Sequence, residues 1–223
     1  MTGTRMIPFQ REVMDPQESL IAGRKYFDQM NTRRSVRDFA DTPVPRELIE
    51  AAVAVANTAP SGAHQQPWTF VAVSDSEMKL RIREAAEAEE RVNYDGGRLP
   101  DAWREAIAPL GTDASKPFLE IAPWLVVLFA QKSTPMPDGS LRKNYYVNES
   151  VGIACGLFLS AVHQMGLVSL THTPNPMGFL TEICQRPGTE RPFVLMPVGY
   201  PAAGCEVPAL QRKPLEDALV VFD

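Results

Sequence analysis

A long apolar segment, from about Tyr145 to Met165, limits the folds that this chain can adopt. Its apolar residues follow helical spacing and cover so much of the helix surface that the helix belongs at the centre of the protein. Gly166 supplies a stop signal at the C-terminal end. The nearly unbroken apolar stretch, Val151 to Val162, is shorter than the roughly 18 residues that a membrane span needs. We therefore expect a buried central helix and no membrane segment.

Segments on both sides of this helix predict helices and strands in mixed order. The order indicates an α+β domain whose sheet packs against helices. The residues from 132 to 141 are interpreted as a loop, and those from about 95 to 117 as a mobile insertion, because both are rich in helix and strand breakers. Periodicity predicts further helices at about 15–30, 45–57, 75–91 and 178–184, and strands at 68–73, 124–129, 167–170 and 193–198.

The C-terminal residues Ala218 to Phe222 form an apolar strand pattern with no following element to cover it. An unpaired apolar strand is a liability that is usually removed by pairing with another strand. A second subunit is the expected partner.

Charge and length exclude several classes of function. The 22 Lys and Arg against 27 Asp and Glu give a net charge of -5, so there is no electrostatic case for nucleic acid or an anionic membrane surface. The first eight residues lack the apolar region of a secretory signal, and Cys155, Cys184 and Cys205 form no disulfide framework. A cytoplasmic protein acting on small molecules is expected. His64 and the other two histidines lack metal-ligand spacing, so no structural metal is expected.

The segment from Thr58 to Trp68 is the main candidate for a ligand-binding loop. Its prolines remove backbone donors, and Gly62 permits dihedrals that a Cβ would forbid. The backbone N–H groups of Gly62, Ala63 and His64 are therefore expected to be free for a ligand. A plain surface loop between two elements is the alternative.

Five short motifs carry a resemblance that extends from about residue 30 to the C-terminus. They are Arg33-Arg34-Ser35-Val36-Arg37, Ala59-Pro60-Ser61-Gly62-Ala63-His64 with Gln66-Pro67-Trp68, Asn148-Glu149-Ser150, Pro197-Val198-Gly199-Tyr200-Pro201, and Arg212-Lys213-Pro214-Leu215. Together they resemble the FMN-dependent nitroreductase superfamily and, within it, the iodotyrosine deiodinase family. Each motif is weak alone, but their joint occurrence in family order is specific.

The resemblance implies a nitroreductase-like fold: a single FMN-binding domain over 1–223 with a central mixed sheet packed by helices. It implies an intertwined homodimer in which the C-terminal strand is exchanged and each FMN contacts both subunits. It also implies a substrate lid at about 88–117.

The resemblance also implies which residues bind FMN. A guanidinium cluster suits the FMN phosphate, since it offers charge-assisted bonds, and a cation near flavin N1 and O2 favours the reduced cofactor. The alternative for the first cluster is a solvated basic turn ahead of a helix. The cofactor residues implied are Arg33, Arg34, Ser35 and Arg212 around the phosphate, Val36 in the same motif, Arg37 at the flavin ring, and Ser61 at the flavin or ribityl chain.

Thr171, His172 and Thr173 form the next implied cofactor segment. Thr173 matches the family residue near flavin N5 and is the candidate catalytic residue, because a donor there lets a flavin pass electrons singly. His172 departs from the Thr-rich run of the family, and strand alternation turns it away from Thr173. The alternative is that both threonines only finish a strand.

Four residues are implied in substrate binding: Ala63, Glu90, Tyr94 and Lys116. Glu90 would bind an ammonium and Lys116 a carboxylate, while Tyr94 bonds or packs and the Ala63 N–H holds a phenolate. Glu90 and Tyr94 share a helix face because they are four residues apart. Spacing alone would favour a solvated helix face and an ordinary surface lysine.

The implied activity is FMN-dependent reductive dehalogenation of halotyrosines, namely 3-iodo-L-tyrosine, 3,5-diiodo-L-tyrosine and their bromo and chloro counterparts. A broad NAD(P)H-dependent nitroreductase or quinone reductase is the alternative enzyme, and a flavin-storage protein is the non-enzymatic one. The electron donor is left open among NAD(P)H, a flavodoxin or ferredoxin, and a reductase. Thiol chemistry at Cys155 is disfavoured, because its place in the apolar helix suits an inert core residue.

Overall fold

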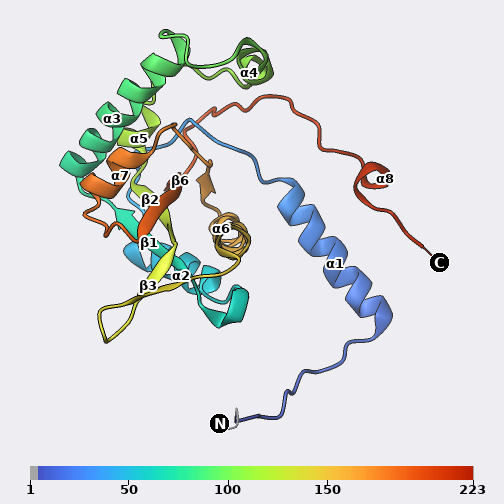
Figure 1. Ribbon diagram of the computed structural model, residues 1–223. Coiled ribbons are helices and arrows are strands. Elements are labelled where there is room, and N and C mark those ends of the chain that lie inside the picture. The colour runs from blue at the N-terminus through green and yellow to red at the C-terminus, as the bar shows by residue number, and fades with distance from the viewer. Residues whose placement is uncertain (1–4, 223) are drawn as a thin grey trace. The chain divides into compact units, whose positions relative to one another are not determined.

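The structure is a computed structural model that describes residues 5–222 (Figure 1). The chain divides into two compact units, Met1–Arg33 and Arg34–Asp223. The first unit holds one helix, α1 (Pro16–Asn31), as the sequence predicts. Asp15 caps it by accepting a 2.8 Å hydrogen bond from the Gln17 N–H, and Pro16 fits the first helical turn.

The second unit is built on a four-stranded sheet with the order β1-β2-β6-β5. The strands are β1 (Trp68–Val73), β2 (Trp124–Gln131), β5 (Val168–Ser169) and β6 (Glu190–Gly199). All three pairings between these strands are antiparallel, and a parallel bridge between Ser35 and Ser169 makes the sheet mixed. The four strands predicted at 68–73, 124–129, 167–170 and 193–198 are confirmed.

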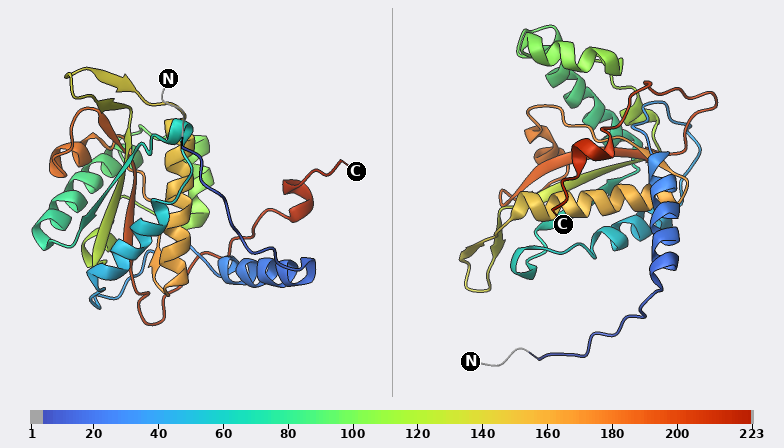
Figure 2. Two further views of the ribbon diagram at one scale, coloured as in Figure 1. Left: turned by 90° about the horizontal axis from the view of Figure 1, so that it is seen from below. Right: turned by 90° about the vertical axis from the view of Figure 1, so that its right-hand side faces the viewer.

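Helices cover both faces of the sheet, as Figure 2 shows. Strand alternation places Val126 and Leu128 of β2 in one core with α2 (Arg46–Ala56) and α6 (Val147–Gln164). Leu125 and Val127 lie in a second core with α3 (Ser76–Tyr94), α5 (Phe118–Ile121) and α7 (Gly178–Ile183). Burial on both faces explains why β2 is apolar without alternation.

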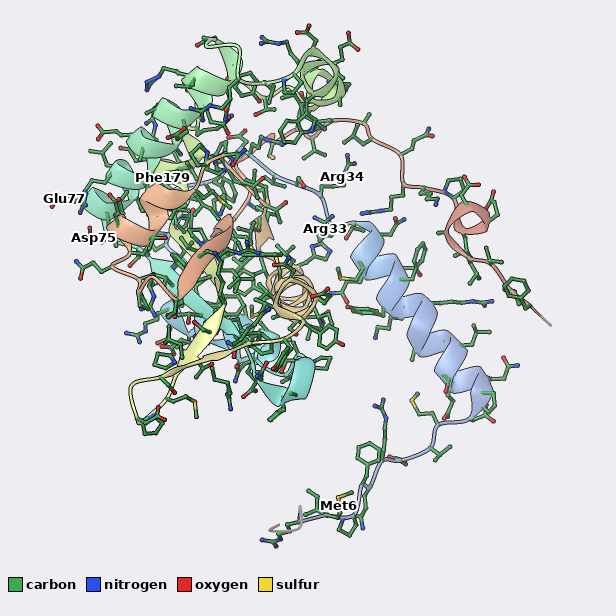
Figure 3. All side chains as sticks on the ribbon, in the orientation of Figure 1. Met6, Arg33, Arg34, Asp75, Glu77 and Phe179 are labelled. Carbon is green, nitrogen blue, oxygen red and sulfur yellow. The ribbon has the colours of Figure 1, made fainter. Side chains whose placement is uncertain are left out.

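The central helix is α6, and its prediction is confirmed. Phe158, Val151 and Ala154 are fully buried in it. The chain leaves the helix through Gly166, whose φ of +76° is a conformation that favours glycine. In a different helix, α3, Asp75 caps the N-terminal end by accepting a 2.8 Å bond from the Met78 N–H (Asp75 is labelled in Figure 3).

Two segments expected to be irregular contain secondary structure. Residues 133–143 form a hairpin of β3 (Ser133–Pro135) and β4 (Leu141–Lys143), with Gly139 at a φ of +82° in its turn. The expected mobile insertion holds α4 (Asp101–Ile107) and the 3-10 turn η2 (Ala108–Leu110). The expectation of irregular chain was wrong in both segments, because these elements are only three to seven residues long, too short for a periodic signal. The mobility expected of residues 95–117 stays a prediction.

The C-terminal segment forms one short helix, α8 (Leu215–Ala218), and then extended chain at Leu219. Residues 218–222 pair with no strand of the described chain, and Phe222 is 94% exposed. The expected pairing with a second subunit stays a prediction. No described helix combines the length and the apolar character that crossing a membrane requires.

Candidate functional site

The structure brings together the three residues predicted to hold a zwitterion. Glu90 and Tyr94 lie on the last two turns of α3, and Lys116 arrives just before α5. The Lys116 Nζ lies 5.3 Å from the centroid of the Tyr94 ring, within cation–π distance. Arg104 of α4 donates a 3.0 Å bond to the Tyr94 carbonyl, which ties the expected lid to the end of α3.

Lys116 is buried, at 2% exposed, and its ammonium is bonded to oxygens of its own segment. The Nζ donates to the Thr112 hydroxyl at 3.0 Å and to the Asp113 carbonyl. Within residues 5–222, it forms no ion pair with a carboxylate. Burial lowers the pKa of Lys116 below 10.5, and the nearby charge of Glu90 opposes this shift. A carboxylate brought by a ligand would stabilise this cation.

Arg37 belongs to the same cluster, although it was predicted as a cofactor residue. Its guanidinium acts on the pKa of Tyr94, Lys116 and His172. Burial raises the pKa of Tyr94, and Glu90 adds to this shift while the charge of Arg37 opposes it. The predicted flavin cation and the predicted substrate residues therefore form one electrostatic site.

His172 also points into this cluster. Its side chain is buried, its ring meets Phe118 edge-on at 5.8 Å, and its Nε2 lies 3.9 Å from the Glu90 Oε1. Burial, together with Lys116 and Arg37, lowers the pKa of His172 to about 3. Its neighbours Thr171 and Thr173 are exposed, as strand alternation predicts. The sequence predicted that His172 turns away from Thr173, but it did not predict that His172 then faces Glu90.

The loop around the turn η1 (Gly62–His64) differs from its prediction in two ways. The Gly62 N–H donates to the Ser150 hydroxyl at 3.2 Å, and the His64 N–H donates to the Ser61 carbonyl at 3.0 Å. Only the Ala63 N–H lacks a protein partner among the described residues. The expectation of three free N–H groups was thus wrong for two of them, because the loop's own backbone satisfies one and a side chain of α6 satisfies the other.

Gly62 is required for space and not for unusual dihedrals. The positive φ angles are at Ala63, with 49°, and His64, with 53°. A Cβ on Gly62 would lie 2.8 Å from Cδ2 of Tyr146 and 2.9 Å from the Tyr145 carbonyl oxygen. The loop and the start of α6 therefore pack too closely for any side chain at this position.

Apart from Arg33, the predicted phosphate residues lie at the start of the second unit and in its C-terminal segment. Arg34, labelled in Figure 3, donates from its guanidinium to the Pro208 carbonyl, four residues before Arg212. Ser35 is exposed and forms the bridge to Ser169. Val36 is buried, and its backbone N–H donates to the Ser169 carbonyl at 3.2 Å. Arg33 is half-buried and belongs to the first unit.

The remaining predicted cofactor residue is Ser61. Its side chain is half-buried, and its hydroxyl accepts a 2.9 Å bond from the Gln66 N–H. Because a hydroxyl both accepts and donates, this bond leaves its proton available to a ligand.

The donor set of this site fits a flavin mononucleotide. Arg34 and the exposed hydroxyl of Ser35 are suited to a phosphate, and Arg37 supplies a half-buried cation. The unpartnered Ala63 N–H and the exposed hydroxyl of Thr173 add donors for polar ring atoms or a substrate oxygen.

Comparison with known proteins places the chain among flavoenzymes. The sequence model of the nitroreductase family matches residues 30–200. An iodotyrosine deiodinase from Haliscomenobacter hydrossis is 55% identical over 97% of each chain, and one from Nematostella vectensis is 42% identical over 96% of this chain and 81% of its own. A crystal structure of oxidized iodotyrosine deiodinase bound to FMN and 3-iodo-L-tyrosine superposes with a TM-score of 0.76 at 30% identity, over 89% of this chain and 98% of that one.

Proposed function

Because the chain belongs to the nitroreductase family, we propose that it is an FMN-dependent oxidoreductase that reductively dehalogenates halotyrosines. The observation that carries this proposal is the cluster of Glu90, Tyr94 and buried Lys116, because a carboxylate and an ammonium close together suit a zwitterionic amino acid. The relatives named iodotyrosine deiodinase support it through identity over nearly the whole chain. Substrates are 3-iodo-L-tyrosine and 3,5-diiodo-L-tyrosine, and the bromo and chloro analogues.

Lys116 and Glu90 act on opposite charges of the amino acid. The buried Lys116 ammonium lacks a carboxylate partner in the described chain, and the substrate carboxylate would supply one. Glu90 would bind the substrate ammonium, with Tyr94 packing beside it. Because the site is largely shielded from water, these contacts are stronger than the same pairs in bulk solvent.

The Ala63 N–H would hold the phenolate oxygen at the other end of the substrate. An ortho halogen acidifies the phenol, so a site built for phenolate prefers a halotyrosine to tyrosine at neutral pH. The left-handed backbone at Ala63 is part of this arrangement, since it leaves that N–H outside the bonding of the turn.

Reduced FMN, when bound, supplies the two electrons that, with one proton, replace the carbon–halogen bond by carbon–hydrogen and release halide. Arg34, Ser35 and Arg212, with Arg33, would hold the phosphate, and the buried Val36 would support the segment that carries Arg34 and Ser35. Arg37 would stabilise negative charge on the ring, and Ser61, Thr171 and Thr173 would donate or accept hydrogen bonds at its polar edge, with Thr173 nearest the reacting centre.

The arrangement of the whole protein follows from the same proposal. Residues 1–223 act as one FMN-binding domain, in which residues 88–117 close on bound substrate and exclude water. Two chains form a homodimer by exchange of C-terminal strands, and the exposed apolar residues Leu219, Val221 and Phe222 supply the surface for it. NAD(P)H, a flavodoxin or ferredoxin, or a reductase supplies the electrons.

A broad-specificity nitroreductase or quinone reductase is the second candidate, favoured by the family alone. A promiscuous reductase has no need of a charged pair that selects a zwitterion. The FMN-loaded protein should be reduced without oxygen and mixed with 3-iodo-L-tyrosine, and iodide and tyrosine should then be measured. We expect one iodide per tyrosine formed. Turnover of nitroaromatics with NAD(P)H, combined with no iodide release, would establish the alternative.

A further inference from the structure

The Glu90 carboxylate is flanked by a potential donor at each of its oxygens. The Asn93 side-chain amide lies 3.5 Å from Oε2, and the His172 Nε2 lies 3.9 Å from Oε1. Asn93 is itself held, because it also donates to the Asn175 carbonyl at 3.2 Å. The carboxylate that the proposed function assigns to the substrate ammonium is therefore placed between two side chains of the protein.

The His172 Nε2 is a buried polar atom without a hydrogen-bond partner among the described residues. Leaving such an atom unpaired is costly, so its position needs a reason. The imidazole cannot easily turn away. Its backbone bonds Leu195 in both directions, at 2.8 and 3.0 Å, and Phe118 packs against the ring.

The groups facing His172 determine its charge. Glu90 faces it from α3, Lys116 from the segment before α5, and Arg37 from the start of the second unit. Burial and the two cations hold the pKa of His172 at about 3, so the imidazole is neutral at neutral pH. A neutral donor can orient a carboxylate without neutralising it, whereas an imidazolium would compete with the substrate for the same charge.

We propose that His172 is a positioning residue that directs the Glu90 carboxylate toward the substrate ammonium through an Nε2–H···Oε1 contact. The proposal rests on the proposed function and deepens it, because it assigns a source of selectivity for amino acids over simple halophenols. The present 3.9 Å separation must shorten by about 1 Å to give a hydrogen bond. Such contacts commonly tighten when a ligand closes the site.

The test compares two substitutions in the FMN-loaded protein. His172→Leu removes the donor, and His172→Gln keeps an amide that reaches a similar position. Affinity for 3-iodo-L-tyrosine is measured by quenching of flavin fluorescence, and 2-iodophenol, which lacks the amino acid group, is measured in parallel. We expect His172→Leu to weaken iodotyrosine binding about 10-fold and leave 2-iodophenol unchanged, and His172→Gln to restore most of the affinity.

A double substitution tests whether His172 acts through Glu90. In the Glu90→Gln background, His172→Leu should cause no further loss, because the carboxylate that it positions is already absent. The ratio of the dissociation constants of His172→Leu and the unsubstituted protein should stay constant from about pH 5.5 to 8, since a neutral imidazole does not titrate there. Taking the ratio cancels the titration of the substrate itself.

Three results would overturn the proposal: unchanged iodotyrosine affinity in His172→Leu, an equal loss for 2-iodophenol, or a ratio of dissociation constants that changes in either direction between about pH 5.5 and 8. Thermal unfolding of each variant shows whether a loss of affinity comes from misfolding. If His172→Leu misfolds, the unsubstituted protein is compared with His172→Gln instead. If the unsubstituted protein neither binds nor dehalogenates iodotyrosine, the proposed function fails, which is distinct from failure of the His172 assignment.

Discussion

The backbone N–H of Lys116 donates a 2.7 Å hydrogen bond to Oε1 of Glu87, one turn before Glu90 on α3. The same oxygen accepts a 2.9 Å bond from Nε of Arg83, whose Nη1 bonds Glu120 at 2.7 Å. The main chain of Lys116 is thereby fixed to α3 independently of its ammonium. The spacing between the two charges of the proposed clamp depends on this contact.

We expect Glu87→Gln to destabilise the protein by about 1–2 kcal/mol and to weaken halotyrosine binding, because the charge-assisted bond from Arg83 is lost. Burial would raise the pKa of Glu87, but the bonds from Lys116 and Arg83 outweigh it and hold the pKa below 4.5. The stabilisation is therefore present above pH 4.5 and is lost as pH falls through the folded-state pKa. Urea unfolding of both proteins across this range measures it.

The matched control is Glu84→Gln, which changes an exposed glutamate on the same helix. Its free energy of unfolding should stay within about 0.5 kcal/mol of that of the unsubstituted protein. Glu87→Gln and the unsubstituted protein should differ less in their free energy of unfolding as the pH falls below 4.5. If the difference stays the same at low pH, Glu87 is not the ionised residue assigned here.

Removing the Lys116 ammonium should act on amino acid substrates alone. Lys116→Met keeps the length of the side chain, and we expect it to weaken 3-iodo-L-tyrosine binding by about 10- to 100-fold without affecting 2-iodophenol. Lys132→Met, at an exposed position, is the control. Iodotyrosine affinity that survives Lys116→Met would remove this residue from the substrate site.

Gly62 and Ala63 should respond to substitution in opposite ways. Gly62→Ala places a methyl group within 3 Å of the Tyr145 backbone and the Tyr146 ring, so we expect about 1–3 kcal/mol of destabilisation. Ala63→Gly relieves a left-handed conformation and should be neutral or stabilising by up to about 1 kcal/mol. Equal destabilisation by both changes, measured by thermal unfolding, would show that the loop is shaped by other contacts.

The cysteines should take no part in the reaction. Burial raises the pKa of Cys155 and of Cys184 to about 11, so only a small fraction of either thiol is ionised near pH 8. In the native protein, a thiol reagent should label the half-buried Cys205 first. Cys155→Ala should retain iodide release, and loss of release in a folded Cys155→Ala protein would revive a thiol mechanism.

Periodicity in the sequence predicted the helices and strands whose apolar residues are buried at regular spacing. It missed the elements that bury few residues. Leu125 to Phe129 reads as a strand because both faces of β2 are buried, and α6 reads as a helix because its apolar surface is broad. The hairpin at 133–143 escaped prediction because its two strands are short and contain no buried residue, and its turn residues dominate the local composition.

The site shows a similar division. Glu90 and Tyr94 could be paired from sequence because helical spacing is local, whereas Lys116 needed the family resemblance, since it meets them across an irregular segment. The proximity of Arg37 and His172 to Glu90 depends on tertiary packing that no spacing rule encodes. The spatial need for Gly62 likewise arises from the start of α6, more than eighty residues away.

The backbone of His172 pairs with Leu195. In the segment from Thr171 to Thr173, the His172 side chain is therefore on the buried side, and both threonines are on the exposed side. Because side chains in an extended chain alternate, inserting or deleting one residue here would exchange those sides. The imidazole would then be turned to solvent and a threonine would face Glu90. The length of this segment is therefore constrained as well as its composition, because a change of one residue in length would displace His172 and both threonines together.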